Sequence, residues 1–240
     1  MQAGLLSLPA GEIQVWLCAR ATIADSDQFR RQVLSRYCAV PPGDWQFSSG
    51  RWGKPDIAAP AAPLRFNLSH SGDWLAMAVA AGGALGIDLE RIKPGRDVLR
   101  LARRFYHPLE IEALETRDPA ERDAAFHDLW TLKEAHVKCR GLALPPLLQQ
   151  LAFACPEPGA IASDIARRDT AEDASVYALV DCLPGYRLAL NWLRDASDSP
   201  EPVTLRLKAF VEGEMKTPWP ASGLRASTGS VELVDELPTG

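Results

Sequence analysis

The sequence predicts an α+β fold from two adjoining strand patterns and one helical pattern. Between residues 75 and 80 bulky side chains alternate with alanines, and a second alternating run follows at 84–89. The two runs flank the pair Gly82-Gly83, and each has the period of two that a strand requires. At 127–140 apolar residues recur at helical spacing with no helix breaker among them. We therefore expect a strand pair and a helix at the centre of the molecule.

The N-terminal elements follow from local patterns. Residues 13–18 alternate well enough for a first strand. Asp27 is the expected N-cap of a helix over 28–37, which carries an apolar stripe. The stretch 41–63 is rich in proline and glycine, so we expect a loop there.

Further elements are expected downstream of the central strands. The patterns at 109–114 and 122–140 predict helices. Strands are expected near Ala152, at 175–180 and at 186–193, and a Leu-Pro-Gly turn should join the last two in a hairpin.

Composition limits the function. With 47% hydrophobic residues, the 240-residue chain can bury a sizeable core, and its net charge of -5 argues against nucleic acid as a main partner. We found neither a signal peptide nor an apolar run of membrane-spanning length, so we expect a cytoplasmic protein without a membrane partner. The cysteines show no C-x-x-C pairing, which favours reduced thiols over zinc or disulfides: Cys18, Cys38, Cys139, Cys155 and Cys182.

Two acidic residues lie on the second central strand. Strand geometry places Asp88 and Glu90 on one side, while Ile87 and Leu89 enter the core. Neighbouring carboxylates repel unless a cation or a proton lies between them. The pair is therefore either a metal site or a solvated strand end.

A polar segment precedes the first central strand. Ser69, His70, Ser71 and Gly72 have the composition of a turn with small hydrogen-bond donors, which suits phosphate oxygens. The alternative for His70 is a core or turn histidine bonded to a backbone carbonyl.

The helix at 127–140 carries a third polar group. Glu134 and Lys138 are i,i+4 neighbours, as are Trp130 and Glu134. Taken alone, Glu134 and Lys138 would fit a surface salt bridge as well as a functional site.

Three motifs occur in a fixed order along the chain: F-N-L-S-H-S-G, then G-I-D-L-E, then W-T-L-K-E-A-x-x-K. The tripeptide Gly-Lys-Pro lies upstream at 53–55 and Gly-Tyr-Arg downstream at 185–187. In this order and spacing the chain resembles the long, pseudo-dimeric 4′-phosphopantetheinyl transferases that activate peptide and polyketide synthases. The resemblance covers roughly residues 30–193.

The resemblance implies a fold and an organisation. It implies an α/β (α+β) fold of two pseudo-symmetric halves with the active site at their interface, in a monomer. The first half, 1–83, would contact the nucleotide of coenzyme A, and the second, 84–195, would hold the metal and meet the carrier protein. Residues 196–240 would form a C-terminal extension, with one strand at 203–211 and partial disorder after it.

The resemblance also implies an activity and a set of residues. The activity is the transfer of the phosphopantetheine arm of coenzyme A to a serine of an apo acyl or peptidyl carrier protein, with Mg²⁺ as cofactor. The family's metal ligands match Asp88, Glu90 and Glu134. Its coenzyme A contacts match Lys54, Pro55, Ser69, His70, Lys133 and Lys138, and its catalytic groups match Glu134, Lys138, His70 and Glu110. Glu110 and Glu134 are the alternatives for the base that takes the serine proton.

The chain departs from the family between its first strand and first helix. The family carries a further basic helix there for the 3′-phosphate of coenzyme A, whereas this chain has only the stretch ARATIADSDQ. Arg31 and Arg36 are the remaining candidates for the 3′-phosphate, and a solvated helix face is the alternative.

Two other functions stay open at this point: a different Mg²⁺-dependent enzyme that cleaves a pyrophosphate, and an inactive relative that only binds carrier proteins. A basic run at 91–104, with six basic residues and one acidic residue, follows the metal strand. We expect this run to steer an acidic carrier protein, with plain solvated surface as the alternative.

Overall fold

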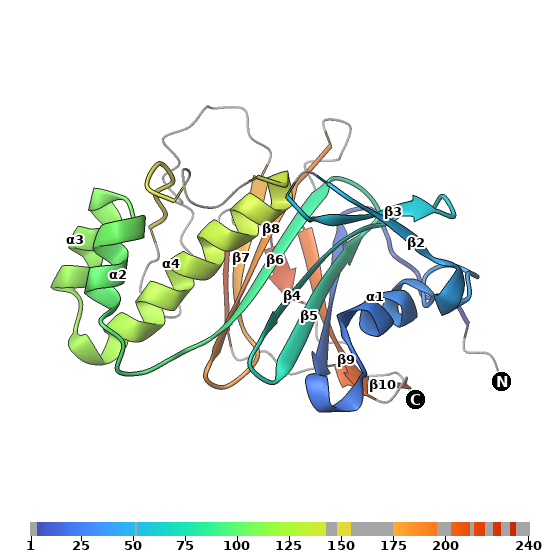
Figure 1. Cartoon of the computed structure of the whole chain (residues 1–240), viewed down its shortest axis with the longest axis horizontal. Helices are drawn as coiled ribbons and strands as arrows, with labels where there is room; N and C mark the ends of the chain where they lie inside the picture. The colour runs from blue at the N-terminus through green and yellow to red at the C-terminus, as the bar shows by residue number, and fades with distance from the viewer. Residues whose placement is uncertain are drawn as a thin grey trace.

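The computed structural model describes residues 4–50, 52–142, 148–154, 175–195, 203–211, 214–218, 223–226 and 231–233. In these ranges the chain forms two large β-sheets and a separate hairpin, with helices on the outer faces of the sheets (Figure 1). The two large sheets pack face to face around a shared apolar cluster.

The first sheet has the strand order β10-β9-β1-β5-β4, with β12 on β9. Strands β1, β5 and β4 pair antiparallel, whereas β9 runs parallel to β1 although it comes from the far end of the chain. The bounds are β1 (Glu12–Ala19), β4 (Arg65–Ser71), β5 (Trp74–Ala80), β9 (Val203–Val211), β10 (Glu214–Pro218) and β12 (Val231–Leu233).

The second sheet has the order β11-β7-β8-β6 and is antiparallel throughout. Its strands are β6 (Ala84–Arg91), β7 (Ser175–Asp181), β8 (Tyr186–Leu193) and β11 (Gly223–Ala226). The edge strand β6 lies beside β4, the edge strand of the first sheet (Figure 1).

The remaining elements lie outside the sheets. The helices are α1 (Ser26–Leu34), α2 (Val98–Phe105), α3 (Pro108–Thr116) and α4 (Pro119–Arg140), with short 3-10 turns η1 (Arg20–Thr22) and η2 (Pro42–Asp44). The hairpin is β2 (Gln46–Ser49) with β3 (Pro55–Ala59).

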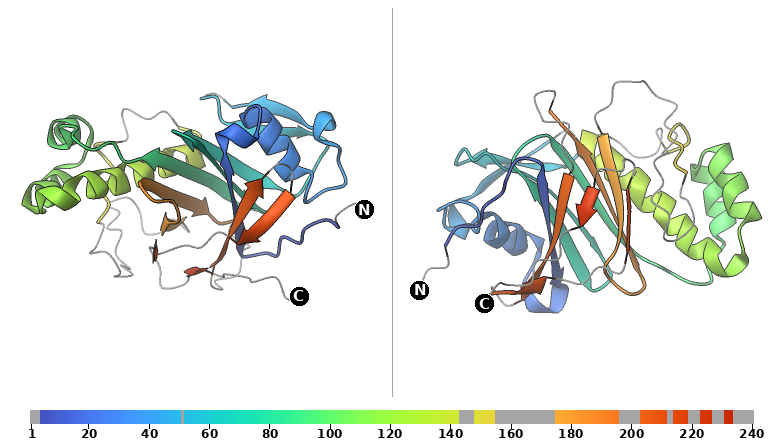
Figure 2. Two further views of the ribbon diagram at one scale, coloured as in Figure 1. Left: turned by 90° about the horizontal axis from the view of Figure 1, so that it is seen from below. Right: turned by 180° about the vertical axis from the view of Figure 1, so that it is seen from behind.

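Three apolar clusters fill the space between these layers. The largest lies between the two sheets, and the alanines of β5 and the residues Ile87 and Leu89 of β6 belong to it. A second cluster joins α1 to the outer face of the first sheet, and a third joins α2, α3 and α4 to the outer face of the second. Figure 2 shows the resulting order from two further sides. The molecule is thus a mixed α/β structure with a helix layer on each side of a two-sheet core.

The structure confirms the central elements that the sequence predicts. Strands β5 and β6 flank the glycine pair, β7 and β8 form the expected hairpin, and β9 occupies the expected range 203–211. The bulky residues of β5 face α1 and its alanines face the second sheet, as the alternation requires. The pseudo-symmetry of the two halves and the division at residues 83 and 195 stay predictions.

Several local predictions were wrong. The N-cap of α1 is Asp25, whose carboxylate accepts the backbone N–H of Gln28 at 2.7 Å, because Asp27 is engaged by the arginines of its own helix. The predicted loop at 41–63 contains the hairpin β2–β3. Ala152 lies outside any strand, and α2 was not foreseen.

Four cysteines lie in the described ranges, and all four are free thiols: Cys18, Cys38, Cys139 and Cys182. Cys155 and most of the extension after residue 195 lie outside the described residues. Within the described part, no helix combines the length and the apolar character needed to cross a bilayer.

Candidate active site and metal-binding site

The site exists because helix α4 lies directly on strand β6. Gly86 is the point of contact: a Cβ atom there would lie 1.9 Å from the carbonyl oxygen of Ala135 and 2.5 Å from the amide nitrogen of Cys139. Only a residue without a side chain allows this approach. The close contact brings the polar face of α4 over the two carboxylates that follow Gly86 on β6.

Charged contacts hold α4 near its C-terminus and near its middle. Near its C-terminus, the Lys54 ammonium donates to the backbone carbonyls of Leu85 and Cys139, both at 2.9 Å. Towards its middle, the buried Asp128 forms 2.7 Å ion pairs with Arg187 of β8 and Arg225 of β11. The position of the helix on the second sheet is therefore fixed by charge as well as by packing.

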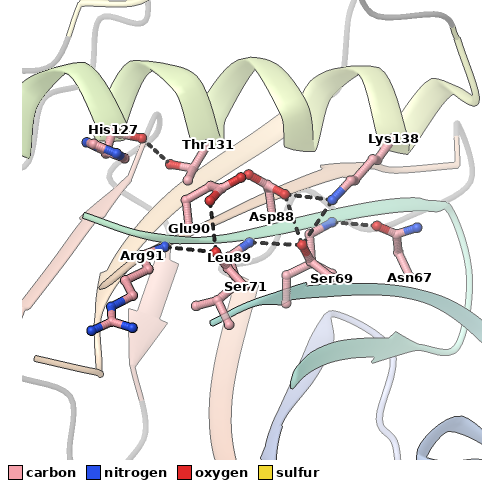
Figure 3. A network of polar contacts seen from close by, with 11 residues as sticks. Asn67, Ser69, Ser71, Asp88, Leu89, Glu90, Arg91, His127, Thr131 and Lys138 are labelled. Carbon is pink, nitrogen blue, oxygen red and sulfur yellow. Dashed lines mark hydrogen bonds and ion pairs between the residues drawn. The ribbon is translucent and has the colours of Figure 1, made fainter. Parts of the chain in front are cut away.

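Figure 3 shows Asp88 and Glu90 pointing from β6 toward α4, as the period of two predicted. Asp88 is buried, and its Oδ1 accepts the Ser69 hydroxyl at 2.9 Å and the Lys138 ammonium at 2.6 Å. Its other oxygen, Oδ2, is buried without a hydrogen-bond partner among the described residues. An unpartnered buried carboxylate oxygen has a large desolvation cost, which a bound cation would offset.

Glu134 of α4 completes a group of three acidic side chains. Burial, together with the nearby Asp88 and Glu90, raises the pKa of Glu134 to about 7, although Lys138 opposes the shift. Burial is the main cause, because a carboxylate taken out of water holds its proton more tightly, and the two neighbouring negative charges add to the shift. The three carboxylates fit a hard divalent ion in their donor chemistry. Across the described ranges, however, no three metal-ligating side chains already stand in coordination geometry.

A row of side chains on β4 joins the two sheets beside these carboxylates. The side-chain oxygens of every second residue of β4 accept every second backbone N–H of β6, at distances of 2.8–3.2 Å. The pairs are Asn67 with Ile87, Ser69 with Leu89 and Ser71 with Arg91. We call this row the seam. It satisfies donors that an edge strand would otherwise leave open.

The seam corrects the interpretation of residues 69–72 as a turn. Ser69, His70 and Ser71 belong to strand β4, and only Gly72 and Asp73 form the turn. Because neighbouring strand residues face opposite ways, Ser69 and Ser71 enter the seam while His70 is exposed. Exposure rules out the alternative of a core histidine and leaves His70 accessible to a ligand.

Glu110 and Lys133 lie together but apart from the seam contacts. They form a 2.8 Å ion pair in which both side chains are buried, and Lys133 also donates to the carbonyls of Leu148 and Leu151. Burial raises the pKa of Glu110 and lowers that of Lys133, and each charge opposes the shift of the other. Glu110 also accepts the N–H of Phe153 at 2.9 Å. The structure thus shows a buried ion pair, and the catalytic role of Glu110 and the coenzyme A contact of Lys133 stay predictions.

The remaining candidates for coenzyme A contacts lie on the β2–β3 hairpin and at α1. Pro55 begins β3, next to Lys54, whose pKa burial lowers. Arg31 is engaged by Asp27 at 2.6 Å and by the carbonyl of Trp45. Arg36 is partly exposed just beyond α1.

A pocket of about 170 Å³ opens next to Glu90. Its floor is apolar and its rim basic, and it is lined by Glu90, Lys93, Arg96, Leu101, Phe105, Phe126, His127 and Trp130. The imidazole of His127 contacts the Asp123 carbonyl at 2.6 Å through Nδ1. Sequence patterns missed this pocket because α2 and the middle of α4 meet only in the folded chain.

The comparisons with known proteins agree with one another. The family model of the 4′-phosphopantetheinyl transferase superfamily matches residues 84–190. The 4′-phosphopantetheinyl transferase Sfp of Bacillus subtilis (strain 168) is 32% identical over 180 residues, which is 75% of this chain and 76% of Sfp. HetI of Nostoc sp., also named a 4′-phosphopantetheinyl transferase, is 36% identical over 131 residues, 53% of this chain and 55% of HetI.

A further 4′-phosphopantetheinyl transferase of Bacillus subtilis is 36% identical over 122 residues, which is 50% of this chain and 52% of that protein. In this match, as in one with a cyanobacterial relative, the chain spans about half the length of the known protein. The region shared with the family model contains β6, α4 and the first part of β8, and with them all three acidic residues of the site.

Proposed function

The chain belongs to the 4′-phosphopantetheinyl transferase superfamily, and we propose on this basis that it transfers the phosphopantetheine arm of coenzyme A to a serine of an apo acyl or peptidyl carrier protein. Adenosine 3′,5′-bisphosphate is the second product. The observation that carries the proposal is the gathering of Asp88, Glu90 and Glu134 beside Lys138, where Oδ2 of Asp88 is buried with no hydrogen-bond partner in the described structure.

In the proposed reaction, the serine oxygen of the carrier attacks the phosphorus that bears the pantetheine arm. A new P–O bond forms there, the bond from this phosphorus to the bridging oxygen breaks, and the bridging oxygen leaves with the nucleotide. Asp88, Glu90 and Glu134 would hold Mg²⁺, which supplies charge neutralisation on the pyrophosphate oxygens. The ammonium of Lys138 contacts Asp88, and we propose that it binds a phosphate oxygen of coenzyme A.

The serine proton needs an acceptor, and the contacts favour Glu134 over Glu110. Glu110 is buried in its pair with Lys133, so it cannot approach a hydroxyl from a partner protein. Glu134 lies beside Asp88 and Glu90 and is only partly buried, so an incoming hydroxyl could reach it.

The carrier is proposed to approach over the pocket next to Glu90. Lys93 and Arg96 line its rim, and both are exposed, as an acidic partner would require. We further propose that the protein is a monomer and lies in the cytoplasm. The described free thiols suit a reducing compartment, and the site takes all its proposed groups from one chain.

The activity can be tested by incubating the protein with coenzyme A, Mg²⁺ and a panel of apo carrier proteins, and then weighing the carriers. A gain of one phosphopantetheine arm supports the proposal. Cleavage of coenzyme A without a mass gain would indicate a different pyrophosphate-cleaving enzyme, and carrier binding without cleavage an inactive binding module. The panel also tells fatty acid, polyketide and peptide carriers apart.

Charge reversal at the pocket rim should weaken the encounter with the carrier. We expect Arg96→Glu to raise the KM for the carrier roughly tenfold at low salt, with Lys93→Glu adding to the effect, because exposed charges act mainly on association. The salt dependence of KM should fall at the same time. Arg103 is a poorer choice, since it already pairs with Glu115 at 2.6 Å.

Arg65→Glu is the matched control, because Arg65 is exposed at the opposite end of β4 and undergoes the same charge change. It should leave the carrier KM unchanged. Equal effects of Arg96→Glu and Arg65→Glu would show that net charge matters and that the docking face lies elsewhere.

Glu134 should make the metal-free protein less stable as the pH rises. Its folded pKa of about 7 lies above the ordinary value of 4.5 for a glutamate, so the folded state binds the proton more tightly than the unfolded state does. Stability from this group is complete below pH 4.5 and is lost between pH 4.5 and 7. Glu134→Gln should therefore melt a few degrees above the parent at pH 8 without metal, and show no such advantage at pH 4.5.

Melting curves from pH 4.5 to 8, with and without Mg²⁺, check this expectation. Adding Mg²⁺ should stabilise the parent more at pH 8 than at pH 4.5 and should act little on Glu134→Gln. A parent and variant whose melting temperatures run in parallel across this range would contradict the assignment.

A further inference from the structure

The two serines of the seam make the same kind of contact with the two carboxylates of β6. Ser69 donates its hydroxyl hydrogen to Asp88 and Ser71 donates its own to Glu90, each at 2.9 Å. Each serine oxygen also accepts the next backbone N–H of β6, at 3.2 Å from Leu89 and 3.1 Å from Arg91. The arrangement therefore repeats at an interval of two residues along both strands.

The two carboxylates nevertheless differ in how many groups hold them. Asp88 is held by Lys138 as well as by Ser69. For Glu90, the hydroxyl of Ser71 is the one hydrogen-bonding contact of the carboxylate within the described part of the chain. Glu90 also borders the pocket, so its side chain has open space beside it.

We propose that Ser71 is a positioning residue for Glu90, which it fixes in the orientation needed to bind the metal ion. The inference rests on the proposed function, because it assigns to Ser71 a part in the same metal site. No sequence motif identified Ser71 for this role; the resemblance assigned functions only to its neighbours Ser69 and His70.

The direction of the Ser71 hydroxyl is determined by its surroundings. A serine hydroxyl has one hydrogen to donate, and here the backbone N–H of Arg91 points at the oxygen, so that hydrogen is free for Glu90. Ser71 is 9% exposed, which limits competition from water and strengthens a hydrogen bond to a charged acceptor. Because the Arg91 N–H belongs to β6 itself, the hydroxyl stays in register with the strand that carries Glu90.

This contact engages only Oε2 of Glu90 and leaves Oε1 for a ligand. Without the hydroxyl, the carboxylate could rotate toward the pocket, and a bound ion would have to restore its orientation. Hydrogen bonds from neighbouring groups to metal-binding carboxylates typically change metal affinity or activity by roughly 10–100-fold. Loss of the Ser71 hydroxyl should therefore weaken metal binding by a factor in this range. Loss of Ser69 should weaken it less, because Lys138 still holds Asp88.

The test uses Mn²⁺ as a spectroscopic probe. Its dissociation constant is measured by electron paramagnetic resonance, with and without coenzyme A, for the parent and for Ser71→Ala, Ser71→Thr and Ser69→Ala. We expect Ser71→Ala to weaken Mn²⁺ binding at least tenfold, Ser71→Thr to restore most of the affinity through its hydroxyl, and Ser69→Ala to have a smaller effect. In arm transfer, Ser71→Ala should be slow at limiting metal and recover at saturating metal.

Asn67→Ala is the matched control. Asn67 forms the same kind of seam bond, to the N–H of Ile87 at 2.8 Å, but its side chain has no contact with a carboxylate in the described ranges. Its loss should lower the melting temperature and leave the Mn²⁺ dissociation constant unchanged. If Ser71→Ala behaves like Asn67→Ala, with a lower melting temperature and parental Mn²⁺ affinity, Ser71 is only a part of the seam.

The outcomes separate this inference from the proposed function. A parent that transfers the arm and binds Mn²⁺ while Ser71→Ala binds it equally well overturns the role of Ser71 and leaves the function standing. A parent that binds Mn²⁺ but modifies no carrier in the panel removes the proposed function, and Ser71→Ala still reports on the metal site. A parent that binds no Mn²⁺ overturns both.

Discussion

Replacing Asp88 with alanine should abolish arm transfer while leaving the fold intact. Asp88 is one of three proposed anionic ligands, and its Oδ2 is buried with no partner in the described structure. Its loss should remove most of the metal affinity and several kcal/mol of charge stabilisation on the leaving oxygens. Each 1.36 kcal/mol is a factor of ten in rate, so we expect a fall of about 100- to 1,000-fold or more.

The fold should survive because the acidic groups of the site lower the stability of the folded protein. Asp88 carries a buried oxygen without a partner, and its charge raises the pKa of Glu134. Lys138 is 29% exposed at its side chain, so the ammonium can turn to water when Asp88 is gone. Melting temperature and the rate of carrier mass gain at limiting Mg²⁺ measure the two effects separately.

Asp88→Asn is the control for shape. It keeps the size of the side chain and an oxygen for Ser69, but it loses the charge, so it should be nearly as inactive as the alanine variant. Parental transfer rates in either variant at limiting Mg²⁺ would show that Asp88 is no metal ligand.

The single methyl group that Gly86→Ala adds should lower both the free energy of unfolding and the transfer rate. The added carbon would lie 1.9 Å from the Ala135 carbonyl oxygen and 2.5 Å from the Cys139 nitrogen, and both are backbone atoms of α4 that cannot rotate away. The helix has to move off β6, which we expect to cost about 1–3 kcal/mol or more of unfolding free energy. Glu134 and Lys138 move with it, so the transfer rate should fall even where the protein remains folded.

Gly43→Ala is the matched control, because a Cβ atom at Gly43 meets nothing within 4 Å. It should melt and react like the parent. The measurements are chemical denaturation and the transfer assay, run below the melting temperature of each variant. A Gly86→Ala protein with parental stability and rate would show that α4 does not depend on close contact with β6.

The sequence predicts best those elements whose residues alternate strictly. Strands β5 and β6 could be placed because each has one apolar face buried between layers, and the same period assigned Asp88 and Glu90 to one side. The side of α4 that carries Glu134 and Lys138 also followed from i,i+4 spacing. The placement of these side chains was thus accessible from spacing, whereas their joint interpretation as a metal site came from the family resemblance.

Other parts of the site depend on contacts between segments that are distant in the sequence, and periodicity does not reveal such contacts. The polar residues 67, 69 and 71 alternate, and this signal could have predicted a strand with a polar face in place of a turn. Nothing local, however, tells that this face meets the N–H groups of β6. The pairing of Glu110 with Lys133 is of the same kind, because a motif match does not say whether a charged side chain points to a ligand or into the core.

The parallel pairing of β9 with β1 has a consequence for how the chain folds. Ile13 lies opposite Leu205, so β1 finds one of its two neighbours only after all the residues between them have been made. Until then, one edge of β1 is open to pairing with any other extended segment, including a second nascent chain. Non-local strand pairing of this kind also slows folding. Strands β9, β10 and β12 would thus close the first sheet late, and removing them would leave an edge of β1 open to aggregation even though every proposed active-site residue had been synthesised.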